Sequence, residues 1–396
     1  MKTNRVMAVV ALCASVTVLA SACSSSSGSS AASAASPAPA GSAAASDASG
    51  IPESVAANLA AGANGTFVLP EFPAVKPEAG KKVTAIVFGN QSQAGPIFTD
   101  AFTQAADAAG WTANVVDGKF STDTYLSAVR QAIAQKVDGI VMYVIDCASF
   151  QAGAEEAKAA GIPIIYIEAW DCNEGGGTGS QTGYPLGLYN GLTTDAADYG
   201  QLMRDTGTLQ ADASIAANDG KMNALVLDFK ETLATHTMAE AFVAESAKCS
   251  QCKTTVIDAL FGDFGSALQT KVQTALLQDP TINAVFAAYD DPILNGVANG
   301  IKSANSTAYF SGEGGYPQVI DLLRNGARGM SVAYDVPMEA WASVERLNQI
   351  FHGNTEPIKV GHGVGIIDAN SLPAAGQSWT SGVDFVGAYK KAWGVQ

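Results

Sequence analysis

The sequence predicts an α/β fold of two Rossmann-like lobes, each built on a parallel sheet, and three observations support this prediction. From residue 83 onward, short runs of β-branched and other apolar residues alternate with amphipathic, Ala-rich segments. The alternation stops at a Gly-rich loop, residues 175–191, and then begins again. The pattern predicts about ten strands, more than one six-stranded doubly wound sheet holds comfortably, so two similar halves are the simpler interpretation.

In the first half, strands and helices follow one another regularly. The predicted strands cover 83–88, 113–116, 139–145 and 163–167, and the predicted helices cover 97–109, 124–135 and 150–160. The strands are continuous apolar runs, which is typical of a parallel sheet covered on both faces. Gly110, Gly161 and Pro163 supply the stops that end the helices.

The second half repeats this order after a predicted helix at 196–209. Its predicted strands cover 224–227, 255–257, 284–288, 308–310 and 330–333, and its predicted helices cover 238–246, 268–278, 290–303, 318–324 and 338–351. A last strand begins at 359–360. Parallel open sheets bind ligands at the carboxyl ends of their strands, so two such sheets predict a binding cleft between the lobes.

The first 22 residues have the layout of a secretory signal peptide. Lys2 and Arg5 precede an uncharged apolar stretch that ends in small residues, and Cys23 follows directly. This position resembles the lipobox of bacterial lipoproteins, whose Cys becomes the lipid-modified first residue. The resemblance implies that Cys23 anchors the exported chain to the outer face of the membrane. Because Ala20 stands where the lipobox usually has Leu, cleavage that leaves Cys23 unmodified is the alternative.

Residues 24–50 consist of Ser, Ala, Gly and Pro with a single acid, Asp47. Such a segment cannot offset its chain entropy by burial, so we expect a disordered linker between the anchor and the folded domain. Residues 51–82 then form an N-terminal extension of that domain. No later apolar run is long enough for a transmembrane helix, so we expect contact with the membrane through the lipid anchor only.

Composition and charge exclude several classes of protein. Hydrophobic residues make up 47% and charged residues 15% of the chain, so disorder over the whole length is excluded. The 22 Lys and Arg against 37 Asp and Glu give a net charge of −15. This balance argues against nucleic acid as a partner, because phosphate binding needs a basic face.

Polar and aromatic side chains gather just after the predicted strands. The candidate ligand-binding residues are Asn90, Phe98, Asp146, Glu168, Trp170, His236, Tyr289, Asp290, Glu313 and Tyr334. Aromatic faces suit C–H surfaces and carboxylates accept hydrogen bonds from hydroxyls, a combination that favours a small neutral polyhydroxylated ligand. The alternative is that each residue is a core residue or a cap; Asp290, for example, could be a helix N-cap.

Three segments resemble the type I periplasmic solute-binding proteins of the ribose/galactose-binding branch: 137–141, 157–165 and 283–290. The resemblance covers residues 82 to about 375. It implies two lobes that close on a sugar or polyol and deliver it to the permease subunits of an ABC importer.

The resemblance also implies three chain crossings between the lobes, near 193–195, 334–337 and 363–368. The lobes then comprise 83–194 with 335–363, and 195–334 with 364–396.

The resemblance assigns a stacking role to Phe98 and a sugar-binding role to Glu168. Two positions where the family typically has Arg are Ala169 and His236 in this chain. This difference puts a plain ribose or galactose in doubt and suggests a larger, less polar or differently charged ligand.

Four cysteines remain in the exported domain, and an even number outside the cytoplasm predicts disulfides. Cys147 and Cys172 each follow a strand, and the two strands should be neighbours, so their sulfurs could meet. Cys249 and Cys252 predict a local disulfide; a redox pair or half a metal site is the alternative.

The sequence has only three His, no GxSxG motif and no P-loop, so we expect a binding protein and not an enzyme, without cofactor or metal. We also expect a monomer. Two alternatives stay open: a sensor that presents its ligand to a membrane receptor, and an aromatic cage around a cation built from Trp170, Tyr289 and Tyr334.

Overall fold

The computed structural model describes residues 51–63, 67–68, 74–189, 199–362 and 364–395. The predicted signal peptide, Cys23, the linker at 24–50 and the crossing near 193–195 lie outside the described residues. Within the described part, no helix combines the length and the apolar composition that crossing a bilayer requires.

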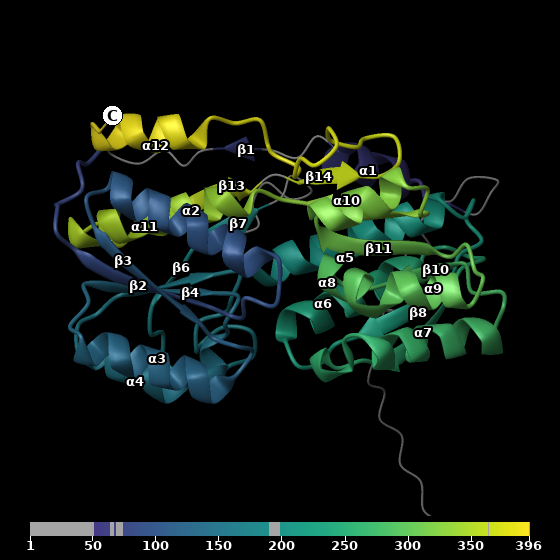
Figure 1. Ribbon diagram of the computed structural model, residues 1–396, viewed down its shortest axis with the longest axis horizontal. Helices are drawn as coiled ribbons and strands as arrows, with labels where there is room; N and C mark the ends of the chain where they lie inside the picture. Colours follow the sequence, from purple (N-terminus) through teal and green to yellow (C-terminus); the bar gives the residue numbers. More distant parts are fainter. Residues whose placement is uncertain (1–50, 64–66, 69–73, 190–198, 363, 396) are drawn as a thin grey trace, which may run out of the picture. The chain divides into compact units, whose positions relative to one another are not determined.

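The first lobe is built on a five-stranded parallel sheet with the order β3-β2-β4-β5-β6 (Figure 1). Its strands are β2 (Lys82–Val87), β3 (Thr112–Asp117), β4 (Gly139–Tyr143), β5 (Ile164–Ile167) and β6 (Tyr184–Pro185). Helices α2 (Ala94–Ala108) and α11 (Val336–Phe351) pack together over one face, and α3 (Thr122–Ala134) and α4 (Gln151–Ala159) over the other. Because both faces are covered, the central strands β4 and β5 are buried at every residue.

The second lobe holds a six-stranded sheet with the order β14-β12-β11-β10-β8-β9, parallel except for β14. Its strands are β8 (Asn223–Asp228), β9 (Lys253–Asp258), β10 (Ala284–Phe286), β11 (Tyr309–Gly314), β12 (Gly329–Ala333) and β14 (Gly365–Ile367). Its principal helices are α5 (Tyr199–Ala216), α6 (Leu233–Ser246), α7 (Ser266–Gln278), α9 (Ala298–Ser303) and α10 (Pro317–Arg324).

A third, small sheet with the order β1-β13-β7 joins segments that are far apart in the sequence. Its strands are β1 (Phe67–Val68), β7 (Gly187–Tyr189) and β13 (Lys359–His362). Strand β7 follows the first sheet, β13 follows α11, and β1 belongs to the N-terminal extension.

The N-terminal extension contacts both lobes. Helix α1 (Ser54–Ala63) packs on α5 of the second lobe, where Asn58 Nδ2 donates a 2.8 Å hydrogen bond to Asp212. Further along, the carbonyl of Val75 accepts a hydrogen bond of 2.9 Å from Asn348 on α11 of the first lobe. The extension therefore adds a connection between the lobes that the sequence did not predict.

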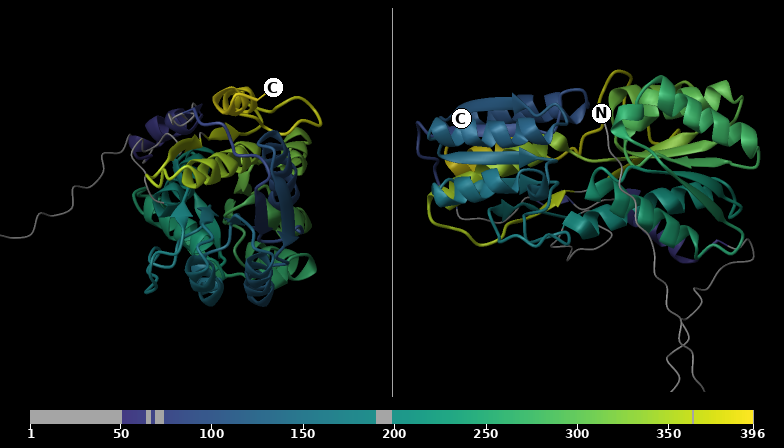
Figure 2. Two further views of the ribbon diagram at one scale, coloured as in Figure 1. Left: turned by 90° about the vertical axis from the view of Figure 1, so that its left-hand side faces the viewer. Right: turned by 90° about the horizontal axis from the view of Figure 1, so that it is seen from below.

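The C-terminal helix α12 (Phe385–Trp393) packs on the first lobe. Residues 364–396 were expected in the second lobe, but α12 lies over the first lobe, where it packs on α11 (Figures 1 and 2). The rings of Trp393 and Trp341 stack there with centroids 5.5 Å apart. The chain crosses back to the first lobe after β14, because this lobe offers the apolar surface that covers the buried indole of Trp393.

All ten strands predicted from the sequence are present, and the additional strands β1, β6, β7 and β14 have two or three residues each. The helix predicted at 290–303 is interrupted. It consists of α8 (Asp290–Pro292), a π-helical turn, η3 (Ile293–Val297), and α9. Gly296 in this turn packs so closely on α7 that a Cβ would lie 2.7 Å from the Leu268 side chain.

Candidate functional site

The carboxyl ends of the two large sheets border a common cavity of about 310 Å³, lined by residues of both lobes. Five of the ten residues predicted from the strand ends line this cavity. They are Asp146, Glu168, Tyr289, Glu313 and Tyr334. The structure therefore brings these five strand-end residues together at one cavity, and their role in ligand binding stays a prediction.

Left-handed backbone marks the strand ends beside the cavity. Val144 after β4 has φ 57°, Glu168 after β5 has φ 48°, and Ala288 after β10 has φ 52°. Residues with a Cβ rarely adopt this conformation, and strained backbone of this kind gathers at binding sites. At Glu168 the unusual turn belongs to a residue whose side chain lines the cavity.

Buried carboxyl groups crowd one end of the cavity. Burial, followed by the nearby charge of Glu168, raises the pKa of Glu313 well above its ordinary value. Burial also raises the pKa of Glu339 on α11, whose side chain forms a hydrogen bond with Glu168. Glu313 in turn accepts a 3.4 Å hydrogen bond from Thr206 Oγ1. Without a bound solute, these carboxyl groups therefore hold protons more strongly than exposed ones do.

A second carboxyl site lies where β4 ends. Asp146 accepts a 3.1 Å hydrogen bond from the backbone N–H of Trp170, and burial raises its pKa to about 6. Glu231, in the loop after β8, lines the same cavity from the second lobe.

Five of the described tyrosines line the cavity as well, and four of them, Tyr199, Tyr289, Tyr316 and Tyr334, are fully buried at their hydroxyls. Burial is the largest cause that raises the pKa of each hydroxyl well above its ordinary value, so all four stay neutral hydrogen-bonding groups.

A row of aromatic rings runs from one lobe to the other beside the cavity. Phe88 and Phe120 of the first lobe have centroids 5.1 Å apart, and Phe120 lies 5.9 Å from Phe261 of the second lobe. Phe261 is 6.4 Å from Tyr289. Much of the lining is therefore flat and apolar.

The lobes also meet through polar contacts. Ser92 Oγ donates a 2.6 Å hydrogen bond to Asp291 Oδ2 of the second lobe. Nearby, Gln318 Nε2 donates to Gln93 Oε1 at 3.1 Å. With lining residues from both sides, these bonds define an arrangement in which the lobes touch beside the cavity.

Four predicted ligand-binding residues lie outside the lining of this cavity. Phe98 is fully buried and stacks on Tyr143 with centroids 4.0 Å apart, so it is a core residue of the first lobe. Asn90 is exposed on the loop after β2. His236 points its Nδ1 to Asp228 at 2.9 Å. Asp290 accepts hydrogen bonds from Ser331 Oγ at 2.8 Å and from the backbone N–H of Tyr316 at 3.0 Å, so it ties β12 to the loop after β11.

Trp170, the tenth predicted residue, lines a neighbouring hollow that shares Asp146 and Glu231 with the cavity. Its ring lies 4.6 Å from that of Tyr199, centroid to centroid. Trp170 therefore stands between the hollow and the cavity.

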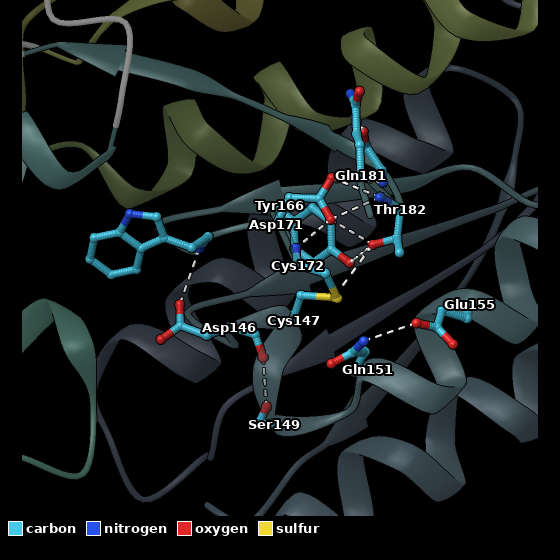
Figure 3. The surroundings of a disulfide bond; sticks show 12 residues. Asp146, Cys147, Ser149, Gln151, Glu155, Tyr166, Asp171, Cys172, Gln181 and Thr182 are labelled. Atoms are coloured by element: carbon cyan, nitrogen blue, oxygen red, sulfur yellow. Dashed lines mark hydrogen bonds between the residues drawn. A yellow bond between two sulfur atoms is a disulfide. The ribbon is translucent and has the colours of Figure 1, made fainter. Parts of the chain in front are cut away.

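The predicted disulfides, Cys147–Cys172 and Cys249–Cys252, are both present, so this prediction is confirmed. The first joins the segments that follow β4 and β5 (Figure 3), and the backbone N–H of Cys147 donates a 3.0 Å hydrogen bond to the Trp170 carbonyl. Asp171 is within reach of both sulfurs, but the disulfide occupies them and leaves none for a metal ion. The Asp171 carboxylate instead accepts hydrogen bonds from the backbone and the hydroxyl of Thr182, at 2.6 to 3.0 Å, and holds the Gly-rich loop in place.

Reading only the residues after strand ends missed much of the lining. Phe88 belongs to a predicted strand, and Tyr316 comes just before the helix that Pro317 begins. Tyr199 and Met203 come from α5, a helix buried along most of its length. Polar residues of this helix, such as Asp205 and Gln210, are buried as well, so the polar spacing could not show which side turns to the cavity.

Within the described residues, the lining of the cavity and of the neighbouring hollow includes no Lys, Arg or His. All the charged residues in the two linings are acids. The site can accept hydrogen bonds from hydroxyl or ammonium groups, and its rings can cover apolar surface.

Comparison with known proteins identifies the family. The family model described as periplasmic binding protein domain matches residues 86–355. No curated protein matches the sequence.

Several solved structures share the fold. A solute-binding protein of an ABC transporter from Agrobacterium vitis, with bound allitol, is 17% identical with a TM-score of 0.63, and the match covers 74% of this chain and 97% of that one. One from Actinobacillus succinogenes, with bound D-allose, is 17% identical with a TM-score of 0.63, covering 74% and 99%. A glucose-galactose binding protein from Geobacillus stearothermophilus is 17% identical with a TM-score of 0.63, covering 75% and 100%.

The family model covers more than half of the chain, and the two parallel-sheet lobes have the architecture of the type I branch. Proteins of this family act outside the cytoplasm and bind solutes rather than transform them, in agreement with the expectation that the chain is not an enzyme. The chain belongs to the periplasmic binding protein family.

Proposed function

We propose that this protein captures a small solute in the cavity between its lobes and delivers it to the permease subunits of an ABC importer. The observation that carries the proposal is the lining itself, to which the strand ends of both lobes contribute. A solute in that position contacts both lobes at once. It therefore favours the closed arrangement over an open one, in which only one lobe could touch it.

A sugar or polyol is the first candidate for the solute. The solved relatives that carry allitol and D-allose support it. Glu168 and Glu313 can accept hydrogen bonds from hydroxyl groups, and Tyr289 and Tyr334 can cover C–H surfaces. Asp146 and Trp170 extend this proposed site toward the neighbouring hollow.

An organic cation is the second candidate, and the one-signed charge of the lining favours it. This candidate includes the aromatic cage expected from the sequence, which is built from Trp170, Tyr289 and Tyr334. A role as a ligand-presenting sensor uses the same lobes and differs only in the partner that recognises the closed form.

For the chain outside the described residues, we propose export by the signal at 1–22, lipid attachment at Cys23 and a linker at 24–50 that tethers a monomeric domain to the outer face of the membrane. Covalent incorporation of a clickable fatty acid, lost in Cys23→Ser, would support the anchor. Equal labelling of wild type and variant would contradict it.

We propose revised lobe boundaries, with the first lobe at 83–194, 335–363 and 385–395, and the second at 195–334 and 364–384. The packing of α12 on α11 supports the change.

Thermal unfolding tests the function directly. The full chain is unfolded and refolded to remove any carried solute, and is then heated with pentoses, hexoses, polyols, nucleosides and amines. A solute at about a thousand times its Kd adds roughly 4 kcal/mol to stability and raises Tm by several degrees. Loss of that shift in Glu168→Ala would place the solute in the cavity. A folded sample that responds to no solute would contradict the proposal.

A further inference from the structure

The cavity carries charge of one sign only. Asp146, Glu168, Glu231 and Glu313 line it, and Glu339 stands directly behind Glu168. Asp146 and Glu168 belong to the first lobe and Glu231 and Glu313 to the second, so both lobes contribute acids to the lining. Among the described residues, no Lys, Arg or His lines the cavity.

The groups around Glu313 and Glu339 are also acidic. The influences on the Glu313 carboxyl are burial, the charges of Glu168 and Asp290, and one hydrogen bond from Thr206. For Glu339 they are burial, a hydrogen bond with Glu168, and the charges of Glu313 and Asp335. Among the described residues, every charged group that acts on the carboxyls of Glu313 and Glu339 is an acid. A positive charge brought into the cavity would relieve this repulsion.

The remaining walls suit a positive charge on an organic molecule. Tyr199, Tyr316 and Tyr334 all lie close enough to Glu168 for its charge to act on their hydroxyls. Aromatic faces attract ammonium groups, and this attraction grows when water is excluded. Phe88 and Phe261 supply apolar surface for the rest of such a molecule.

A solute with a negative charge would meet no Lys, Arg or His in the described lining of the cavity. His236 lies on α6 outside the lining, and its ring nitrogens face Asp228 and Glu240 at 2.9 and 3.5 Å. A carboxylate or phosphate on the solute would find hydroxyl donors in the described lining, but no positive charge, and it would lie among acids. Neutral sugars remain compatible with the site, but they would leave the protons on its buried carboxyl groups.

We propose that the solute is an organic ammonium ion, a primary or quaternary amine, whose positive charge lies between Glu168 of the first lobe and Glu313 of the second among the cavity tyrosines. This inference rests on the proposed function, because it concerns the solute of the same cavity. It deepens that function by naming the chemical class. It also gives closure a physical reason, since one cation draws two acidic lobes together.

The test compares matched pairs of probes that differ in charge. Calorimetric titration of the full chain uses choline against its uncharged tert-butyl analogue, galactosamine against galactose, and a panel of amines against the corresponding alcohols. We expect at least one cation to bind about tenfold or more tightly than its neutral partner. Glu168→Gln and Glu313→Gln should each weaken the binding of that cation by about tenfold or more. Glu155→Gln, on the exposed side of α4, should leave it unchanged.

Proton release is the second readout. The groups facing the bound charge are the carboxyls of Asp146, Glu168, Glu231, Glu313 and Glu339 and the neutral cavity tyrosines. A permanent cation such as choline lowers the raised pKa values of Asp146, Glu313 and Glu339 and expels protons, so titrations in buffers of different ionisation enthalpy should differ in measured heat. A neutral sugar should give equal heats.

The outcomes separate this inference from the proposed function. If neutral sugars bind as tightly as their amino counterparts and release no protons, the cation assignment is overturned while solute capture stands. If a folded sample binds neither class, both are overturned.

Discussion

The hydroxyl of Ser92 in the first lobe donates a hydrogen bond of 2.6 Å to the carboxylate of Asp291 in the second. Both side chains are almost fully buried, at 3% exposure each, and Ser92 also lines the cavity. Ser92 precedes the first turn of α2 and Asp291 lies in α8, so the bond joins the starts of two helices. It makes the wall of the cavity depend on the contact between the lobes.

Ser92→Ala should therefore weaken the binding of whichever solute the cavity holds. Removing the donor leaves a buried carboxylate short of a partner, at a cost of about 1–3 kcal/mol, or roughly a fivefold to hundredfold loss of affinity. Titration calorimetry measures the change. Ser92→Thr keeps the hydroxyl and should recover most of the affinity. Ser127→Ala, on the exposed face of α3, is the control. Equal affinities for Ser92→Ala and wild type would contradict this role.

Acidification should stabilise the protein. Burial raises the pKa of Asp146 and Asp291 to about 6, that of Asp212 to about 7 and that of Asp290 to about 8. The folded state thus binds more protons than the unfolded chain between about pH 4 and these values, and the free energy of unfolding falls as pH rises through that window. We expect Tm to be several degrees higher at about pH 5 than at about pH 8.

Asp290→Asn should flatten this pH profile, because the most strongly shifted of these four carboxyls no longer titrates. Calorimetric unfolding of both proteins across the range provides the measurement. A wild-type Tm that rises from pH 5 to pH 8 would refute the assignment of these buried carboxyls.

The two disulfides should contribute unequally. Cys147 and Cys172 are separated by 25 residues, and closing a loop of that size stabilises by about 3.5 kcal/mol in the chain-entropy model. Cys249 and Cys252 are separated by 3, which corresponds to about 2 kcal/mol. Denaturant unfolding measures the loss of stability when both cysteines of one disulfide are replaced by Ala, and the two variants made in this way are compared with each other. The opposite order would mean that loop closure is not the main contribution.

Trp393→Ala should destabilise the first lobe, although the residue lies near the chain end. Its side chain is 0% exposed and stacks on Trp341, so truncation should cost about 3–5 kcal/mol in denaturant unfolding. Leu277→Ala, at a side chain that is 59% exposed, should change stability by at most about 0.5 kcal/mol. Similar effects of the two substitutions would show that α12 is only loosely attached.

The sequence predicted the large sheets well because their strands carry their own signal. Strands such as β4 are buried on both faces and read as continuous apolar runs bounded by helices. Strand β1 has only two residues, which pair with His362 and Gly361. This pairing joins segments far apart in the chain, so no local sequence pattern predicts it. The place of α12 was missed for a similar reason, since the side of the molecule on which it packs depends on where the chain crosses.

The site was half predictable. The strand-end rule led to Asp146, Glu168 and Glu313, because topology alone brings those positions together. The same rule gave Phe98 and His236, whose side chains turn to Tyr143 and Asp228. The direction of a side chain depends on neighbours from other elements, and a single strand end does not specify them.

The left-handed backbone at Val144, Glu168 and Ala288 bears on protein engineering. Each of these conformations costs roughly 1–2 kcal/mol in a residue with a Cβ, and glycine would remove most of that cost. A selection for heat resistance alone would therefore favour glycine at these positions, of which Val144 and Glu168 line the cavity. Variants selected in this way should have a higher Tm but a lower affinity for the solute. A screen for stable biosensors built on this chain should therefore keep these three residues unchanged.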